Sequence, residues 1–96
     1  MLPLTFEWDP DKDRRNQRKH GVSFSEASSV FFDEQGLLIH DPGHSKAEDR
    51  YLLLGMSAKL RVLVVSHTYR DDDRVIRVIS AWIATPLERD QYVPFL

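Results

Sequence analysis

The run RYLLLGMSAKLRVLVVSHTYR, residues 50–70, decides the fold, because it reads as two adjacent strands. Its first part, residues 50–56, and its second part, residues 60–70, are rich in the aliphatic, β-branched and aromatic side chains that favour strands. Only residues 57–59 separate the two parts, a length typical of a β-hairpin connection. We therefore expect an antiparallel hairpin, and the rest of the chain is interpreted outward from it.

Toward the C-terminus, a further strand and a helix are expected. The charged turn DDD, residues 71–73, leads into RVIRVISAWIA, residues 74–84, which we predict as the last strand. Thr85 then offers an N-cap, with Pro86 at the first helical position and Glu88 three residues after the cap. A short helix is expected to begin there.

Toward the N-terminus, two short strands enclose two helices. LTFEW, residues 4–8, and LLIHD, residues 37–41, read as the strands. Between them, Ser23 and Glu26 have the spacing of a capping box, and the apolar residues that follow recur on one helical face. This segment is the helix that should supply a core stripe.

The other helix is expected over residues 9–21 and has an unusual composition. Asp9 suits its N-cap, Pro10 its first position, and Gly21 a left-handed end. Residues 11–19 contain no apolar side chain. Such a helix buries only aliphatic stems, or it presents its face to a ligand.

These segments give the order β-α-α-β-β-β-β-α. Consecutive hairpins favour an antiparallel sheet with helices packed on one face, which is a small α+β fold. A chain of 96 residues fits a single domain, residues 1–96.

Composition excludes several classes of protein. Hydrophobic residues make up 42% and charged residues 29%, which is ordinary for a folded soluble domain. The chain has no cysteine, so disulfides and Cys-based metal centres are excluded. No signal peptide or membrane-spanning run is visible, so we expect a cytoplasmic protein with no membrane contact. The formal net charge is −2, so nucleic-acid binding would need a local basic face.

Such a face is available on the first helix. Lys12, Arg15 and Lys19 fall on one side of it, and Arg14 and Arg18 form an adjacent row. Rows of this kind can position phosphates, although charge runs are more often solvated surfaces. The sequence leaves both interpretations open, along with that of an interaction domain unrelated to RNA.

His20 is the next candidate, because it lies at the C-terminal end of this helix. There it could bind phosphate or donate a proton to a leaving oxygen, or it could simply cap the last carbonyls. In HDPGHSKAEDR, residues 40–50, Glu48 and Arg50 share strand parity and could face a phosphate or each other. The two histidines of this segment lie across a Pro–Gly turn, so we expect no metal.

Two arginines in the sheet are the last candidates. By alternation Arg61 shares a face with Leu63 and Val65, and Arg77 shares one with Ile79 and Ala81. An arginine within an apolar stripe is costly unless it is paired or reaches an edge. Each could act on a phosphate or simply extend its head group into solvent.

The chain resembles the BrnT family, the toxin half of BrnT/BrnA type II toxin–antitoxin systems. The matching segments cover nearly the whole chain in order: FEWDPDKDRRNQRKHGVSF, EASSVFFDE, DPGHSKAEDRYLLLG, LVVSHTYR, RVIRVISA and ERDQY. The resemblance implies a RelE-like fold and a metal-independent endoribonuclease, without cofactors, that halts translation. It also implies a BrnA antitoxin with a ribbon-helix-helix domain, a two-plus-two heterotetramer, and contact with operator DNA only through the antitoxin.

The resemblance further implies where the site lies. The residues it favours for catalysis are Lys19, His20, Glu48, Arg50, Arg61 and Arg77, with Glu48 as a possible base. For RNA binding we expect Lys12, Arg15 and Arg18, from the basic rows of the first helix, and Trp82, as an aromatic side chain.

Trp82 departs from the pattern of the family. Related chains commonly have arginine at this position and further basic residues after it, whereas this chain reads VISAWIATPLERD. Trp82 could stack on a base, as aromatic residues do in single-strand binding, or extend the core or an antitoxin contact. The alternative function is therefore a weakened or inactive toxin that acts mainly as an antitoxin-binding corepressor module.

Overall fold

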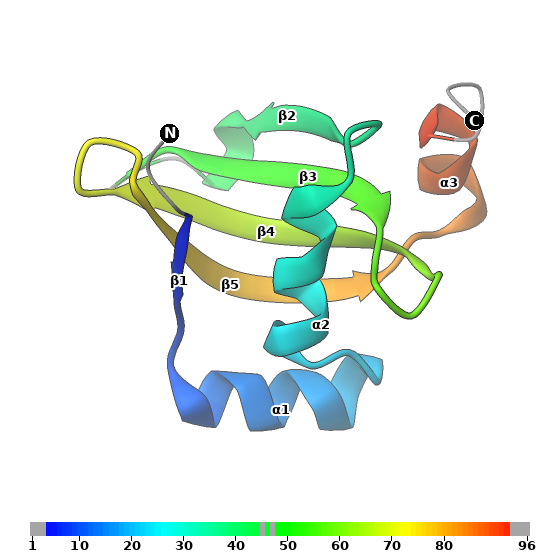
Figure 1. The fold of residues 1–96 in the computed structure, drawn as a ribbon, viewed down its shortest axis with the longest axis horizontal. Coiled ribbons are helices and arrows are strands. Elements are labelled where there is room, and N and C mark those ends of the chain that lie inside the picture. The colour runs from blue at the N-terminus through cyan, green and yellow to red at the C-terminus, as the bar shows by residue number, and fades with distance from the viewer. Residues whose placement is uncertain (1–3, 45, 47, 93–96) are drawn as a thin grey trace.

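The computed structural model spans the chain and describes residues 4–44, 46 and 48–92. Along the described residues, strands and helices follow in the predicted order (Figure 1). The elements are β1 (Thr5–Glu7), α1 (Pro10–His20), α2 (Phe24–Ser29), η1 (Val30–Phe32), β2 (Leu37–Asp41), η2 (Pro42–His44), β3 (Arg50–Met56), β4 (Val62–Arg70), β5 (Val75–Ile83) and α3 (Pro86–Tyr92). The α+β fold class is thus confirmed. None of the described helices is long and apolar enough to cross a membrane.

The sheet has the strand order β1-β5-β4-β3-β2. The predicted hairpins are present, since β3 pairs antiparallel with β4, and β4 with β5. The first strand differs from expectation, because β1 pairs parallel with β5. No short turn joins β1 to β5, so nothing imposes the antiparallel pairing that a hairpin requires. After β1, α1 and α2 carry the chain across the sheet to the β2 edge (Figure 1).

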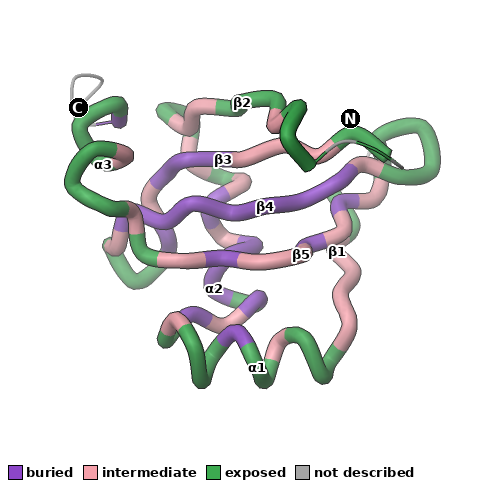
Figure 2. The backbone as a smooth tube through the Cα atoms, turned by 180° about the vertical axis from the view of Figure 1, so that it is seen from behind, coloured by how far each residue is buried: buried purple, intermediate pink, exposed green. Residues whose placement is uncertain are grey.

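The core lies on both faces of the sheet. On one face, Leu63 and Val65 of β4 pack with Phe24 and Ala27 of α2, which confirms the predicted core stripe. On the other face, Val64 packs in a second cluster with Tyr92 of α3. The third helix therefore does not share a face with the first two, because both sets of alternating side chains on β4 need cover. Figure 2 shows β4 buried along most of its length.

A β-bulge interrupts the pairing of β4 with β5. Ser66 lies opposite Ser80, but His67 lies opposite Val78, so Ile79 is an extra residue on β5. A bulge of this kind shifts the alternation of side chains by one. As a result Ala81 and Val78 both enter the core beneath the helices. Strict alternation predicted that Arg77 shares a face with Ala81; this was wrong, because the extra residue between them places Arg77 on the other face.

α1 has the predicted caps. The Asp9 side chain accepts a hydrogen bond from the Asp11 amide at 2.8 Å, and Gly21 closes the helix in the left-handed region at φ 69°. Asn16 is its one buried residue. The Asn16 side-chain amide donates to the carbonyls of Val22 (2.9 Å) and Ala81 (2.8 Å), and its oxygen accepts from the Ala81 amide (3.1 Å).

Asn16 therefore pairs with the edge of β5 just where β1 has ended. A strand edge carries backbone groups that need partners, and one side-chain amide supplies both a donor and an acceptor here. This anchoring explains how a helix without apolar side chains stays on the sheet. It leaves the basic row of α1 directed to the surface.

Candidate functional site

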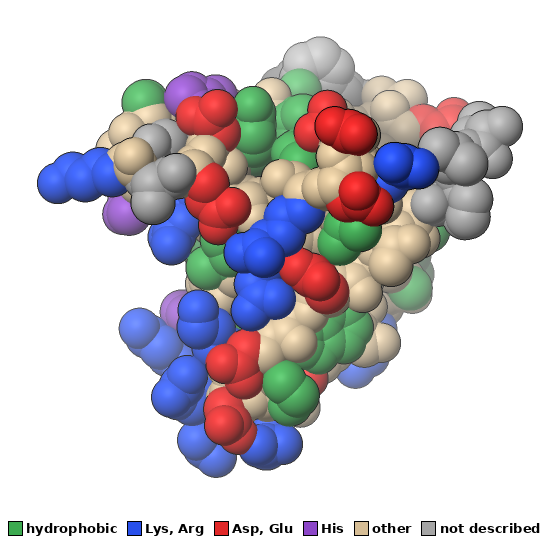
Figure 3. All heavy atoms as spheres, turned by 90° about the vertical axis from the view of Figure 1, so that its left-hand side faces the viewer, with side chains coloured by type: hydrophobic (Ala, Val, Ile, Leu, Met, Phe, Trp, Pro, Cys, Tyr) green, Lys and Arg blue, Asp and Glu red, His purple; other side chains and the backbone are tan. Residues whose placement is uncertain are grey.

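The first hollow of the candidate site lies between α1 and β5. Its volume is about 280 Å³. The side chains around it are mostly basic or polar, and the residues are Lys12, Arg15, Asn16, Lys19, His20, Ile79 and Ser80. Helical spacing aligns the cations, and the Asn16 hydrogen bonds hold them at the edge of the sheet. Lys and Arg side chains gather over α1 at the bottom of Figure 3, below an indentation in the surface.

The second hollow, of about 450 Å³, lies on the face of the sheet opposite α1 and α2. Its lining combines polar and apolar side chains from four strands and from η2: Asp41, His44, Arg50, Leu52, Ser66, Ile79, Ser80 and Trp82. Ile79 and Ser80 line both hollows. We call the two together the β5 groove, because they meet at the bulge of β5.

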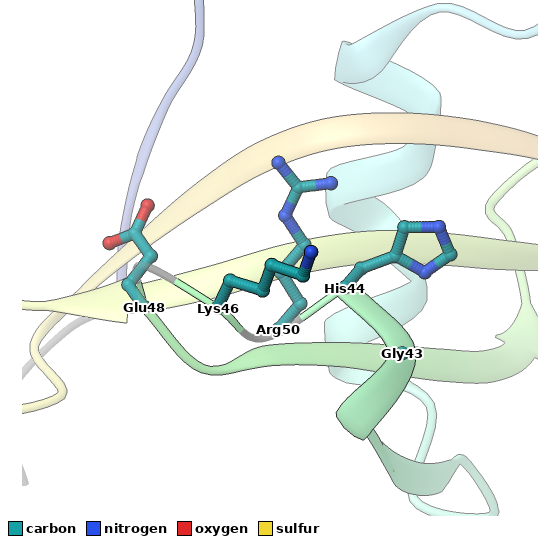
Figure 4. A pocket seen from close by; sticks show the side chains of 5 residues that line it. All are labelled: Gly43, His44, Lys46, Glu48 and Arg50. Carbon is teal, nitrogen blue, oxygen red and sulfur yellow. The ribbon is translucent and has the colours of Figure 1, made fainter.

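A third hollow, of about 400 Å³, extends the β5 groove along the 41–50 segment. It is lined by Gly43, His44, Lys46, Glu48 and Arg50. Figure 4 shows Lys46 and Arg50 lying beside each other, with the guanidinium of Arg50 extended over the sheet and Glu48 pointing away from them. Since Arg50 lines both this hollow and the second one, and Lys46 lines this one, cationic side chains flank the groove at this end as well as along α1.

His20 of the first hollow and Trp82 of the second lie near each other where the two hollows meet. Their ring centroids are 6.3 Å apart, and the rings are tilted by 46°. The indole N–H of Trp82 donates to Oε1 of Glu88 at 3.2 Å. The same oxygen accepts the Thr85 amide at 2.9 Å, so the capping box of α3 also holds the indole.

Glu48 and Arg77 belong to a chain of ion pairs. Arg70 lies 3.7 Å from Glu48 and 3.6 Å from Glu7, and Arg77 lies 3.4 Å from Glu7. Because these side chains are partly exposed, each pair contributes little to stability. The structure therefore pairs Glu48 with Arg70 at the end of the third hollow, and pairs Arg77 with Glu7 of β1 outside the groove.

Arg61 lies in a different environment. Its Nε donates to Oε2 of Glu26 at 2.9 Å, and its Nη2 donates to the Gly21 carbonyl at 3.0 Å. The Glu26 carboxylate, whose side chain is 2% exposed, also accepts the Ser57 hydroxyl at 2.7 Å. Hydrogen bonding to Glu26 raises the pKa of Arg61. Arg61 is thus engaged in a structural bridge between α2 and the β3–β4 hairpin, away from the residues that line the groove.

Of the predicted site residues, the structure brings together Lys12, Arg15, Lys19, His20, Arg50 and Trp82 in the groove, with Glu48 at its end. Arg18 is exposed and is not among the lining residues. Sequence reasoning missed Asn16, Ser66 and Ser80. Asn16 carried a weak signal, as a neutral side chain in a charged helix, but the bulge that exposes Ser80 to both hollows depends on strand pairing.

No metal-binding group emerges from the described part of the chain: no three His, Asp or Glu side chains cluster there. Instead, histidines of the 40–50 segment pair with carboxylates. His44 Nδ1 lies 2.9 Å from Asp41 Oδ2, and His40 Nε2 lies 3.2 Å from Asp49 Oδ1. The chemistry that this arrangement offers is that of cations and proton donors around a floor of polar and apolar side chains.

Comparison with known proteins adds to this geometry. A family model described as the ribonuclease toxin, BrnT, of type II toxin–antitoxin systems matches residues 8–88. A search of curated protein sequences finds no match. The fold is similar to the 1.1 Å crystal structure of the Brucella abortus ribonuclease toxin BrnT, with a TM-score of 0.62 and 24% identity over 86% of this chain and 99% of the other.

Proposed function

The chain belongs to the BrnT family of ribonuclease toxins of type II toxin–antitoxin systems, and from this premise we propose that it is a metal-independent endoribonuclease that cleaves RNA in the cytoplasm and stops translation. The observation that carries the proposal is the β5 groove. Basic side chains of α1 enter it from one side and Arg50 from the other, with Ile79 and Ser80 shared between the two hollows. A phosphodiester in the groove would meet cations on both sides, which offsets the overall charge of −2.

RNA supplies its own nucleophile. In the proposed reaction the ribose 2′-hydroxyl loses its proton, and the oxygen bonds to the adjacent phosphorus. The bond from phosphorus to the 5′-oxygen of the next nucleotide then breaks, and that oxygen takes up a proton. The products are a 2′,3′-cyclic phosphate and a 5′-hydroxyl. The enzyme must place one proton acceptor and one donor, and must stabilise the charge on phosphorus.

The groove offers a group for each task. Lys19 and Arg50 are the cations proposed to stabilise the developing negative charge. His20 is the proposed proton donor to the 5′-oxygen, since it lies at the junction beside Trp82. Glu48 is the proposed base, although its pairing with Arg70 must then open when RNA binds.

Three further cations have supporting roles in the proposal. Lys12 and Arg15 line the α1 hollow and bind phosphates outside the scissile bond. Arg77 stays a candidate only if RNA displaces it from Glu7. Arg61 is not assigned a catalytic role, because its guanidinium is engaged with Glu26 and Gly21.

The proposed partner is a BrnA-like ribbon-helix-helix antitoxin in a two-plus-two heterotetramer, with operator DNA bound only through the antitoxin. What supports a protein partner is the family, because a type II toxin–antitoxin system pairs its toxin with an antitoxin. Large apolar side chains are exposed at several places, among them Phe32 (69%), Leu60 (81%) and Leu87 (80%).

The test of the reaction is cleavage of a labelled RNA by the purified chain in excess EDTA. We expect fragments that end in a 2′,3′-cyclic phosphate and begin with a 5′-hydroxyl, and we expect growth arrest when the chain is expressed without antitoxin. Intact RNA together with normal growth would contradict the proposal. It would favour the alternative of an antitoxin-binding corepressor, in which Trp82 has replaced a required cation.

A further inference from the structure

We propose that Trp82 forms a nucleobase subsite of the β5 groove, in which an unpaired base of the RNA stacks on the indole ring. The inference rests on the proposed function for its ligand, and adds where and how a base is held. It also gives a role to Trp82, which stands where related chains commonly have an arginine.

The indole is placed for stacking. Trp82 is half-buried: it packs against the apolar cluster around Tyr92 and at the same time lines the second hollow. Aromatic rings with one side supported and another side open are the usual platforms for single-stranded bases. The ring therefore brings an apolar surface to the groove without leaving the core.

The orientation of the ring is fixed before any ligand arrives. The indole N–H is bonded to Glu88 Oε1, which also accepts the Thr85 amide. Glu88 and Thr85 form the capping box of α3, since the Thr85 hydroxyl accepts the Glu88 amide at 3.2 Å. A platform that is already immobile loses little conformational freedom on binding.

The neighbours of Trp82 suit the rest of a nucleotide. His20 lies 6.3 Å away between ring centroids, on the α1 side, and Arg50 lines the same hollow from β3. A base on the indole would have its flanking phosphates directed toward these two side chains. Ser66 and Ser80 line the floor of the hollow, where their hydroxyls can bond to the edge of the base.

This subsite selects unpaired RNA. A base within a duplex already stacks on both sides, and its hydrogen-bonding edge is occupied by its partner. Only a base free of a duplex can lie on Trp82. Stacking of this kind contributes about 5- to 150-fold in affinity per base when it is measured by removing the aromatic ring.

The experiment uses the fluorescence of Trp82 in the full chain. The protein has two tryptophans, so Trp8→Phe leaves Trp82 as the sole indole. The probe is a short 2′-O-methyl oligoribonucleotide, which binds but cannot be cleaved because it lacks the nucleophile. The matched probes are an abasic strand of equal length and charge, and the same sequence as a duplex.

We expect the base-bearing strand to quench Trp82 and to bind at least about tenfold tighter than the abasic strand. Measured by isothermal titration calorimetry, which does not need the indole, the preference for the base-bearing strand should persist in Trp82→Phe and disappear in Trp82→Leu, while both variants keep their affinity for the abasic strand. A purely structural role for Trp82 would weaken binding of both strands equally. Circular dichroism of each variant monitors folding.

Equal affinity for the base-bearing and abasic strands, or an undiminished preference in Trp82→Leu, would overturn the subsite. The proposed function is tested separately by cleavage. RNA cleavage without any base preference would refute the subsite alone. A clear base preference without cleavage would refute the nuclease proposal and leave the subsite standing.

Discussion

At the scale of single residues, the contact between Glu26 and Arg61 shows how a cation can look functional in sequence and be structural in the fold. Arg61 binds the carboxylate of Glu26 and the carbonyl of Gly21, the residue that follows His20. The bridge joins α2, the β3–β4 hairpin and the end of α1. The bridge therefore fixes the end of α1, whose side chains line the groove, while Arg61 itself does not line it.

Replacing Glu26 with glutamine should lower the free energy of unfolding by about 2–4 kcal/mol at pH 7, because it leaves Arg61 without its charged partner. Hydrogen bonding from Arg61 lowers the pKa of Glu26 below its ordinary 4.5; burial opposes this, and the Ser57 hydroxyl adds to it. A lowered pKa stabilises the fold above pH 4.5, and the contribution is lost as pH falls through the folded value.

Urea unfolding of wild type and Glu26→Gln between about pH 7 and pH 3 measures both effects. The wild type should lose more stability on acidification than the variant does. Glu34→Gln is the matched control, since Glu34 is exposed. Equal pH dependence in wild type and Glu26→Gln would contradict the role given to this pair.

At the scale of elements, α1 combines a polar composition with a fixed position. Its caps at Asp9 and Gly21 were readable from sequence, because capping is local chemistry. Its anchor was not, since Asn16 bonds to Ala81, 65 positions later in the chain. The parallel pairing of β1 and the bulge at Ile79 share that cause: both depend on which distant strand becomes the neighbour.

Asn16→Ala should destabilise the protein by about 2–4 kcal/mol, because it leaves the Ala81 amide and two carbonyls without partners. The loss should appear locally as faster hydrogen exchange of the Ala81 amide. Gln17→Ala is the control on the same helix, as Gln17 is exposed. If the Ala81 amide exchanged at the wild-type rate in Asn16→Ala, the anchoring of α1 by this side chain would be refuted.

α3 is held to the opposite face of the sheet by Tyr92. Its hydroxyl donates to Asp33 Oδ2 at 2.5 Å, and the same oxygen accepts the Met56 amide at 2.7 Å. Burial, together with the neighbouring carboxylate, raises the pKa of Tyr92 to about 12. The position of α3 affects the groove, because its capping box holds Trp82.

Tyr92→Phe keeps the buried ring and removes this hydrogen bond, so we expect a loss of about 1–2 kcal/mol in unfolding free energy. Thermal or urea unfolding measures it, with Leu87→Ala as a control on the exposed side of α3. Near-UV circular dichroism should also report a change around Trp82. A variant as stable as wild type would show that the Asp33 contact does not hold α3.

At the scale of the whole molecule, a domain with a net negative charge carries a cationic groove, because the fold pairs several acidic side chains with arginines and gathers basic side chains along the groove. The acidic residues Glu7, Glu26 and Glu48 are paired with arginines, and basic residues of α1 line the groove. The sequence identified most of the groove cations, since those of α1 share a helical face. That Arg50 and α1 meet across β5 could not be predicted, because the bulge and the strand order create the meeting point.

The most direct test of the account compares charge-removing variants in the RNA cleavage assay. Lys19→Met and Arg50→Met remove groove cations, whereas Arg14→Met removes an equal charge from a position on α1 that pairs with Asp11 and lies outside the groove. We predict that each groove variant lowers the cleavage rate about 100-fold or more while Arg14→Met stays close to wild type. Equal rates in all three variants would contradict the claim that RNA is cleaved in the β5 groove.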